Sequence, residues 1–353
     1  MFQTSVVADQ QMQYGVVLPI QGIGQSLDDF LGELITEAQV AEESGFDSVF
    51  LPEFHQAKNG AVISPTVIGA AILQATSTLR FGTAVLAAPL HHPIRIAEDT
   101  LMLDWLSSGR FILGLGAGHQ IMDFVAYGVD HGTRTEQFEE ILHILGLCFS
   151  GEPFSHDGDF FQIEAEVTPR PYSEPRPPIW LGGHGVAGID RAARLGDLWL
   201  ADPQRHIEVV AELAEKYRER CDAHATRPAV GMFREAWIAE DQDSAVKEWA
   251  DSVVAVHRLY YNVGAYRPKF EAWATDSLSR SELTFDLLSP GRFLVGDGEL
   301  LRHTVEQWKN LTGVQYLALR FRHPKGPSHE ATCEALRRFG EEVISTTSGS
   351  EEE

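Results

Sequence analysis

Short apolar runs alternate with helical stripes along most of this chain. Residues 78–118 show the pattern most clearly, with an apolar run over 79–88, a helical stripe from Pro93 and a second apolar run over 111–115. Runs of about four to eight apolar residues are typical of buried parallel strands, whereas a period near 3.6 is typical of amphipathic helices. The segment therefore predicts a strand, a crossover helix and a second parallel strand.

The same alternation recurs over the rest of the chain. The predicted strands cover residues 14–19, 46–51, 79–88, 111–115, 178–181, 197–200, 229–238 and 315–321. The predicted helices cover residues 27–44, 65–76, 93–106, 135–149, 189–195, 205–223, 296–313 and a last segment that ends near residue 344. Eight βα units favour an α/β fold of the TIM (β/α)8 barrel type over a doubly wound sheet, and no GxGxxG pattern follows the first strand.

Two segments interrupt this alternation. Residues 150–178 contain two short β-rich pieces around the turn His156-Asp157-Gly158, which predicts a hairpin excursion. Residues 243–292 have a helical front half, an aromatic middle and no obvious strand, which predicts an insertion or lid over the open face of the barrel. The expected organisation is an N-terminal tail over residues 1–13, the barrel with its insertion over 14–345, and a disordered acidic tail over 346–353.

Composition narrows the possible partners. The formal net charge of −23 disfavours nucleic acid and anionic membranes, because both attract basic surfaces. No apolar run approaches the about 20 residues needed to span a bilayer, and no secretion signal opens the chain, so we expect a cytoplasmic protein. Cys148, Cys221 and Cys333 form no CxxC pair and are expected to be reduced packing residues, and no metal site is predicted.

Polar and glycine residues at the carboxyl ends of the predicted strands are the candidates for the active site, because TIM barrels place their chemistry there. They are Glu53 and His55 after the second strand, Thr83, Ala84, Val85, His91 and His92 at the third, Gly116, Gly118, His119 and Gln120 after the fourth, Gly182, Gly183, His184 and Gly185 after the fifth, and Arg320, Arg322 and His323 after the last.

These candidates suggest different roles. His55 and His119 are candidate acid–base residues, with partly exposed loop histidines as the alternative. Glu53 and Asp123 are expected to be structural hydrogen-bonding groups. The GGHG sequence at 182–185 precedes a predicted helix, where backbone N–H groups attract anions, so it is a candidate phosphate site; a tight turn without a ligand is the alternative. The cations after the last strand either hold a substrate anion or pair with the insertion.

Several phrases, in order along the chain, resemble the bacterial luciferase-like family of flavin-dependent monooxygenases and deazaflavin-dependent oxidoreductases. They are SGFDSVFLPEFH (44–55), FGTAVLAAPLHHPIRIAEDTLMLDWLSSGRFILGLGAG (81–118), DFVAYG (123–128), RPPIWLGG (176–183), RAARLGD (191–197) and FLVGDGELL (293–301). The resemblance implies a TIM barrel, usually dimeric, that holds a reduced flavin or deazaflavin in its mouth. It also implies that the ring lies against Thr83, Ala84 and Val85, where the family often has a non-prolyl cis peptide.

The resemblance further implies that the phosphate lies near the GGHG sequence and that His92, Gly116 and Gly118 border the flavin. This chain departs from the family at two positions. Phe54 stands where the family commonly has a histidine, so His55 takes the acid–base role by proximity. Ala117 stands where luciferase has a phosphate-binding arginine, so His184 and backbone N–H groups are expected to hold the phosphate.

Three functions are compatible with these observations. The first is a monooxygenase, expected to be a homodimer, that receives reduced FMN from a separate flavin reductase and oxygenates a small organic substrate with O2 beneath a lid that excludes water. The second is a deazaflavin-dependent oxidoreductase that transfers hydride without O2, with Arg320, Arg322 and Lys325 available for the longer anionic tail of that coenzyme. The third is a weakly active flavin-binding partner subunit, suggested by the missing strand-two histidine.

Overall fold

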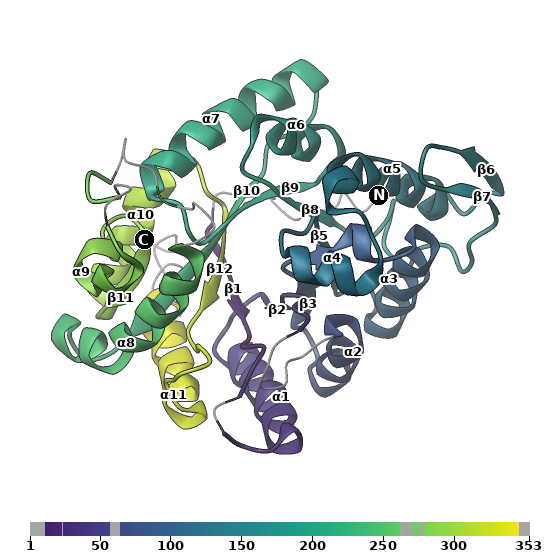
Figure 1. Ribbon diagram of the computed structural model, residues 1–353. Helices are drawn as coiled ribbons and strands as arrows, with labels where there is room; N and C mark the ends of the chain where they lie inside the picture. Colours follow the sequence, from purple (N-terminus) through teal and green to yellow (C-terminus); the bar gives the residue numbers. More distant parts are fainter. Residues whose placement is uncertain are drawn as a thin grey trace, which may run out of the picture.

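Eight parallel strands form a closed barrel at the centre of the computed structural model (Figure 1). The structure describes residues 11–22, 24–56, 64–261, 266, 271–274 and 278–345. In their order around the barrel, the strands are β1 (Gln13–Val17), β2 (Ser48–Leu51), β3 (Arg80–Thr83), β5 (Phe111–Gly116), β8 (Ile179–Gly182), β9 (Leu198–Ala201), β10 (Val230–Ile238) and β12 (Tyr316–Arg320). Pairing of β12 with β1 closes the ring. The predicted TIM barrel is therefore confirmed.

Helices surround the barrel on its outside (Figure 1). They are α1 (Leu27–Glu43), α2 (Pro65–Ala75), α3 (Pro93–Ser107), α5 (Arg134–Phe149), α6 (Val186–Leu195), α7 (Ile207–His224), α8 (Gln242–Tyr260), α10 (Gly298–Thr312) and α11 (His329–Phe339), which continues as a π-helical turn over Gly340–Ile344. The first predicted helix begins as expected, because Ser26 Oγ accepts the N–H of Asp29 at 3.1 Å. Within the described ranges, none of these helices has both the length and the apolar content to span a bilayer.

Large side chains fill the barrel interior. The ring centroids of Phe50 and Trp180 are 5.2 Å apart, and those of Trp180 and Tyr316 are 4.7 Å apart. The Tyr316 hydroxyl bonds to Ser48 and Asp47, and burial raises its pKa well above the usual range. Because the interior is a packed core, a ligand of this barrel has to bind at its carboxyl end.

The third predicted strand, residues 79–88, is broken in the middle. β3 ends at Thr83, and β4 (Leu86–Ala87) resumes after a non-prolyl cis peptide bond between Ala84 and Val85. Thr83 Oγ1 donates to the carbonyl of Gly114 on β5 at 2.6 Å and accepts the N–H of the same residue at 3.0 Å. The apolar pattern of residues 79–88 predicts one continuous strand, because side-chain polarity carries no signal of a break in backbone pairing. The family resemblance, in contrast, implied a non-prolyl cis peptide at Ala84 and Val85, and this is confirmed.

Other short elements also differ from the prediction. α4 (Ile121–Tyr127) lies in the expected loop after β5, and β11 (Phe293–Gly296), which pairs with β10, precedes the predicted helix of residues 296–313. The hairpin of β6 (Phe154–Asp157) and β7 (Gln162–Ala165) is present, but its turn follows His156 and Asp157 instead of containing them. Elements of four to seven residues give too few repeats for periodicity to detect.

The front half of the predicted insertion is α8, and it packs on the barrel. The Trp249 indole N–H donates to the carbonyl of Phe321 at 2.9 Å, so α8 is anchored beside the end of β12. Beyond α8, α9 (Phe285–Leu288) leads into β11. Residues 262–265, 267–270 and 275–277 of the insertion, most of residues 1–13 and the tail from 346 lie outside the described residues, so a lid and two free tails stay predictions. The three cysteines are buried free thiols, as predicted.

The contact between β3 and β5 depends on the lack of a side chain at Gly114. A Cβ there would lie 1.8 Å from the carbonyl oxygen of Thr83. We therefore expect Gly114→Ala to lower the free energy of unfolding by about 3 kcal/mol, because backbone atoms would have to move. The matched control is Gly146→Ala in α5, where a Cβ meets no atom within 4 Å and alanine should stabilise the helix by about 0.5–1 kcal/mol. Urea denaturation followed by circular dichroism measures both, and equal midpoints for the two variants would contradict this account.

Candidate active site

Val85 forms an apolar surface at the barrel mouth. Its side chain packs against the interior core cluster while staying partly exposed. A Cβ on Gly116 would lie 2.7 Å from Val85 Cγ2, and one on Gly182 would lie 3.6 Å from Val85 Cγ1. Gly116 is therefore needed for Val85 to reach this position, and neither glycine places a side chain beside it. Thr83 and Ala84 are buried behind this surface.

Glu53 is the centre of a hydrogen-bond cluster beside the break between β3 and β4. Its Oε1 atom lies 3.0 Å from His55 Nε2 and 2.7 Å from His91 Nε2, and its Oε2 atom accepts the N–H of Ala87 at 2.7 Å. Burial raises the pKa of this carboxyl, but the hydrogen bonds from His91, Ala87 and His55 outweigh it, so the pKa lies below its ordinary value. Glu53 is thus an ionised acceptor at neutral pH, which agrees with its predicted structural role.

The cluster extends from Glu53 to α4. The Tyr127 hydroxyl lies 3.3 Å from each ring nitrogen of His55, and Gln120 Nε2 donates to the His55 carbonyl at 3.2 Å. Burial raises the pKa of Tyr127, and the charges of Glu53 and Asp123 raise it further, so the phenol keeps its proton. A cavity of about 270 Å³ opens here, and its lining consists of Glu53, His55, Ser64, Pro65, Thr66, Leu86, His91 and Tyr127.

The GGHG sequence forms the turn between β8 and α6. Gly185 is the residue before the first turn of α6, and the first backbone bond of that helix runs from Ile189 N–H to the Gly185 carbonyl at 2.9 Å. The N–H groups of a first helical turn have no partner within the helix, so they are available to an anion. His184 is exposed, with Nδ1 3.4 Å from Asp202 Oδ2. The turn is also tight, since a Cβ on Gly183 would lie 3.1 Å from the Cα of Gly188.

The other two predicted histidines lie apart from Glu53. His92 caps α3, where its Nδ1 accepts the N–H of Ile94 at 3.3 Å, and its ring packs edge-on against Phe161 of the hairpin. His119 lies beside Gly118, with its ring 6.3 Å from that of Phe54. Loss of hydration lowers the pKa of His119, so the ring is neutral at pH 7. From the sequence, His91 and His92 were equal candidates. In the structure, His91 is the one that contacts Glu53.

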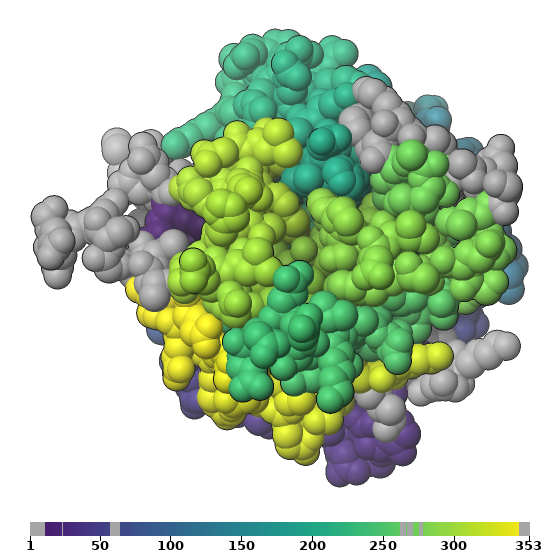
Figure 2. All heavy atoms as spheres, turned by 90° about the vertical axis from the view of Figure 1, so that its left-hand side faces the viewer, coloured from purple at the N-terminus to yellow at the C-terminus, as the bar shows by residue number. Residues whose placement is uncertain are grey.

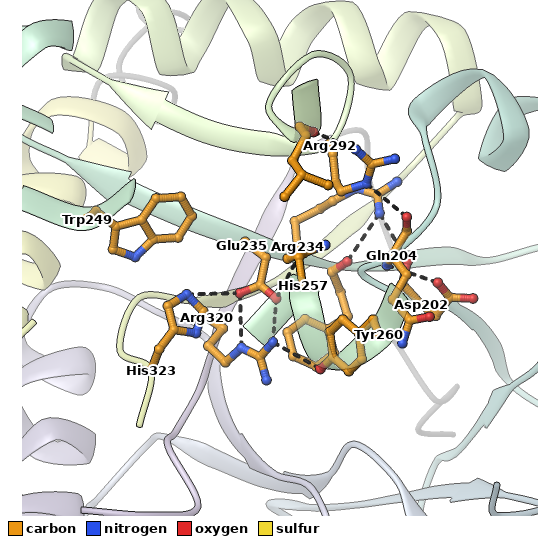
Figure 3. Close-up of polar contacts among 12 residues, drawn as sticks. Asp202, Gln204, Arg234, Glu235, Trp249, His257, Tyr260, Arg292, Arg320 and His323 are labelled. Carbon is orange, nitrogen blue, oxygen red and sulfur yellow. Dashed lines mark hydrogen bonds and ion pairs between the residues drawn. The ribbon is translucent and has the colours of Figure 1, made fainter. Parts of the chain in front are cut away.

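The cations after β12 are paired inside the protein. Arg320 binds both oxygens of the fully buried Glu235 through Nε and Nη2, and its Nη2 atom lies 3.3 Å from the Tyr260 hydroxyl. Figure 3 shows Arg320 and Glu235 facing each other, with His323 Nε2 3.4 Å from the same carboxylate. Burial lowers the pKa of His323 well below its ordinary value, so this ring is neutral and adds no positive charge to the mouth.

Arg322 is likewise engaged with carboxylates of α1. Its Nη1 and Nη2 atoms lie 2.5 Å from Glu37 Oε1 and Glu33 Oε2 respectively. His329 Nδ1 is 3.0 Å from the same oxygen of Glu37, so this acidic group is occupied by cationic and hydrogen-bonding partners. These arginines therefore pair mainly with Glu235, Glu33 and Glu37. The contact of Arg320 with Tyr260, the last residue of α8, lies within the predicted insertion.

A larger cavity, of about 410 Å³, lies on the outside of the barrel. Figure 2 faces this side of the molecule, where α10 and α8 are exposed. Its lining consists of His206, Ile207, Gln242, Ser289, Pro290, Gly291, Phe293, Val295, Leu300, Thr304, Gln307, Trp308 and Leu311. None of these residues lines the cavity beside Glu53, so the two cavities are separate.

Comparison with known proteins identifies the family of this chain. The family model described as luciferase-like monooxygenase matches residues 12–315. The chain therefore belongs to the luciferase-like monooxygenase family, which confirms the resemblance drawn from its sequence. The first two curated relatives are matched over 50% and 90% of their own length.

The chain is similar to proteins that differ in their cofactors. The oxygenase component of a flavin-dependent trigonelline monooxygenase from Acinetobacter baylyi is 24% identical over 288 residues, which are 79% of this chain and 74% of that protein. The oxygenating constituent of 3,6-diketocamphane monooxygenase from Pseudomonas putida, solved in complex with FMN, has a TM-score of 0.81 at 18% identity and covers 95% of this chain and 98% of its own. The coenzyme F420-dependent tetrahydromethanopterin reductase from Methanopyrus kandleri has a TM-score of 0.75 at 18% identity and covers 96% and 100%. At these identities, the two solved structures establish the shared fold alone.

The charge of Glu53 makes stability depend on pH in a defined direction. Because its folded-state pKa lies below the ordinary value of 4.5, the ionised carboxylate stabilises the folded protein above pH 4.5, and this stabilisation is lost as the pH falls through the lower folded-state pKa. We expect Glu53→Gln to lower the free energy of unfolding by about 1–3 kcal/mol at pH 7, and the difference from the parent to shrink below pH 4.5. Chemical denaturation at pH 7 and pH 4 measures this, with Glu219→Gln on the exposed face of α7 as control. A difference that grows on acidification would contradict the pairing.

Proposed function

We propose that this protein is a flavin-dependent monooxygenase that uses reduced FMN and O2 to oxygenate a small organic substrate. The observation that carries the choice of FMN over a deazaflavin coenzyme is the pairing of Arg320 with Glu235 and of Arg322 with Glu33 and Glu37. A long anionic coenzyme tail needs uncompensated cations at the mouth. Of the three candidates, only Lys325 is exposed and not in an ion pair with a described residue.

The residues at the mouth fit a flavin mononucleotide. The partly exposed Val85 offers an apolar surface to a planar ring, while the backbone at Gly116 and Gly182 carries no side chain that would cover that surface. The first turn of α6 and the exposed His184 supply donors suited to one phosphate group. Reduced flavin, when bound, supplies the electrons for the activation of O2.

The chain's own residues would then position the substrate and handle its protons. His55 is buried against Glu53 and Tyr127, where it is held in one orientation and can accept or return a proton at the edge of the cavity. The segment after α8 is proposed to exclude water from the mouth. A homodimer, a separate flavin reductase and a cytoplasmic location complete this proposal. A weakly active partner subunit receives less support, because His55 already occupies an ordered acid–base environment without the missing strand-two histidine.

The choice of cofactor has a direct test. We expect the purified protein to bind FMN, measured by quenching of flavin fluorescence, and to consume O2 when supplied with FMNH2 and a panel of small organic compounds. Coenzyme F420 should bind at least about tenfold more weakly, because the arginines at the end of β12 are already neutralised. Tighter binding of F420 than of FMN would reverse the assignment, and absence of turnover without a copurified homologous chain would favour the partner-subunit alternative.

The role of His55 has a separate test. We expect His55→Ala to lower turnover of the best substrate in that panel about 10²-fold or more, because a positioned proton-transfer group is removed, while FMN affinity stays within about twofold of the parent. His143→Ala, on the outer helix α5, is the matched control and should change neither quantity. Unchanged turnover in His55→Ala would exclude this residue from the mechanism.

A further inference from the structure

The geometry points to Tyr127 as the catalytic acid–base group of the cavity beside the barrel mouth, acting with a His55 imidazole that Glu53 locks in a single tautomer. This inference rests on the proposed function, because it assigns the proton-transfer residues of that same site. It adds Tyr127 as a residue that would contact the substrate, and Glu53 as the positioning residue behind it. The substrate class it implies is a small molecule with a hydroxyl group that exchanges its proton during the reaction.

The tautomer follows from the donors around Glu53. An ionised carboxylate can only accept hydrogen bonds, and Oε1 of Glu53 lies within 3.0 Å of the Nε2 atoms of both His55 and His91. Both rings must therefore carry a proton on Nε2. A neutral imidazole has one proton, so Nδ1 of His55 is left as an acceptor.

Tyr127 supplies the donor for that acceptor. Its hydroxyl lies 3.3 Å from Nδ1 and also 3.3 Å from Nε2 of His55, and the two ring centroids are 4.9 Å apart. Because Nε2 is already used by Glu53, the phenolic proton is directed to Nδ1. The result is a chain of hydrogen bonds from Tyr127 through His55 to Glu53. It resembles the arrangement of hydroxyl, base and orienting carboxylate in a catalytic triad.

The exposed fractions of the two side chains indicate which of them exchanges a proton with the substrate. His55 is only 7% exposed, whereas Tyr127 on α4 is 45% exposed and lines the cavity of about 270 Å³. A substrate in that cavity therefore meets the phenol before the imidazole. The hydroxyl groups of Ser64 and Thr66, which also line the cavity, can hold the polar part of such a substrate.

The proton-transfer step is balanced without a further reactant. The O–H bond of Tyr127 breaks as its proton moves to Nδ1 of His55, and the phenolic oxygen takes the proton released by the substrate hydroxyl. The imidazolium that forms is stabilised by the carboxylate of Glu53, and the reverse transfer returns a proton to the product. His91, with a side chain 27% exposed, keeps the second donor on the carboxylate and so fixes its orientation.

Nitrogen NMR of the apoprotein tests this arrangement without flavin or substrate. In protein labelled with ¹⁵N-histidine, the signals of His55 are those missing from His55→Ala. We expect Nε2 to be protonated and Nδ1 to be unprotonated at pH 7. Tyr127→Phe should move only the Nδ1 signal, because the ring stays and the donor is lost. Tyr172→Phe, an exposed tyrosine that packs on Trp105, is the matched control and should move neither signal.

Removal of the orienting acid is the second arm. Glu53→Met should leave His55 in a mixture of tautomers, because the acceptor for Nε2–H is gone. A protonated Nδ1 in the parent protein, or a Tyr127→Phe spectrum identical to that of the parent, would overturn the inference even if Glu53→Met fails to fold. The NMR result is independent of the cofactor. If the protein shows a single His55 tautomer but does not bind FMN, the proposed function is contradicted, whereas the hydrogen-bonded arrangement of Tyr127, His55 and Glu53 is supported.

Discussion

The carboxylate of Glu53 joins three parts of the chain that meet only in the folded protein. It follows β2, it accepts the backbone N–H of Ala87 on β4, and it holds the rings of His55 and His91 at 3.0 and 2.7 Å. A buried carboxylate without such donors would be costly, so each partner is required for the others to stay in place. The carboxylate of Glu53 therefore positions two features. One is the break between β3 and β4, which presents Val85 to the mouth, and the other is His55, which lines the cavity.

The arginines after β12 are neutralised by carboxylates in this acidic protein. The chain carries 28 basic and 51 acidic side chains, and the arginines at the end of β12 are paired with Glu235, Glu33 and Glu37. These pairs connect β12 to β10, and the segment after β12 to α1. Among the described residues after β8, the backbone N–H groups of α6 and His184 are donors that suit a single phosphate. Proteins of similar fold include one solved with FMN and one that depends on coenzyme F420, and the proposal of FMN for this chain rests on the paired arginines.

Periodicity predicted most of the elements and their order. The eight strands and the long helices were recoverable because side chains of a strand or helix alternate with a fixed period whatever their neighbours are. The helix α4 and the strand β11 were not, because they are too short for periodicity to detect, whereas the break between Thr83 and Leu86 followed from the family resemblance and not from periodicity. His91 and His92 are adjacent in the sequence and were equal candidates, and only the structure separates them, since His92 caps α3 whereas His91 binds Glu53.

By itself, the sequence determined the barrel, the set of strand ends at which chemistry can occur and the family to which the chain belongs, because these depend on local pattern and on phrases in order. Only the tertiary structure decided which of the candidate residues act together. His55 and Tyr127 are 72 positions apart and Glu53 and His91 are 38 apart, so no local pattern relates them. Their association depends on where the barrel closes and on which nitrogen of each ring meets a buried charge.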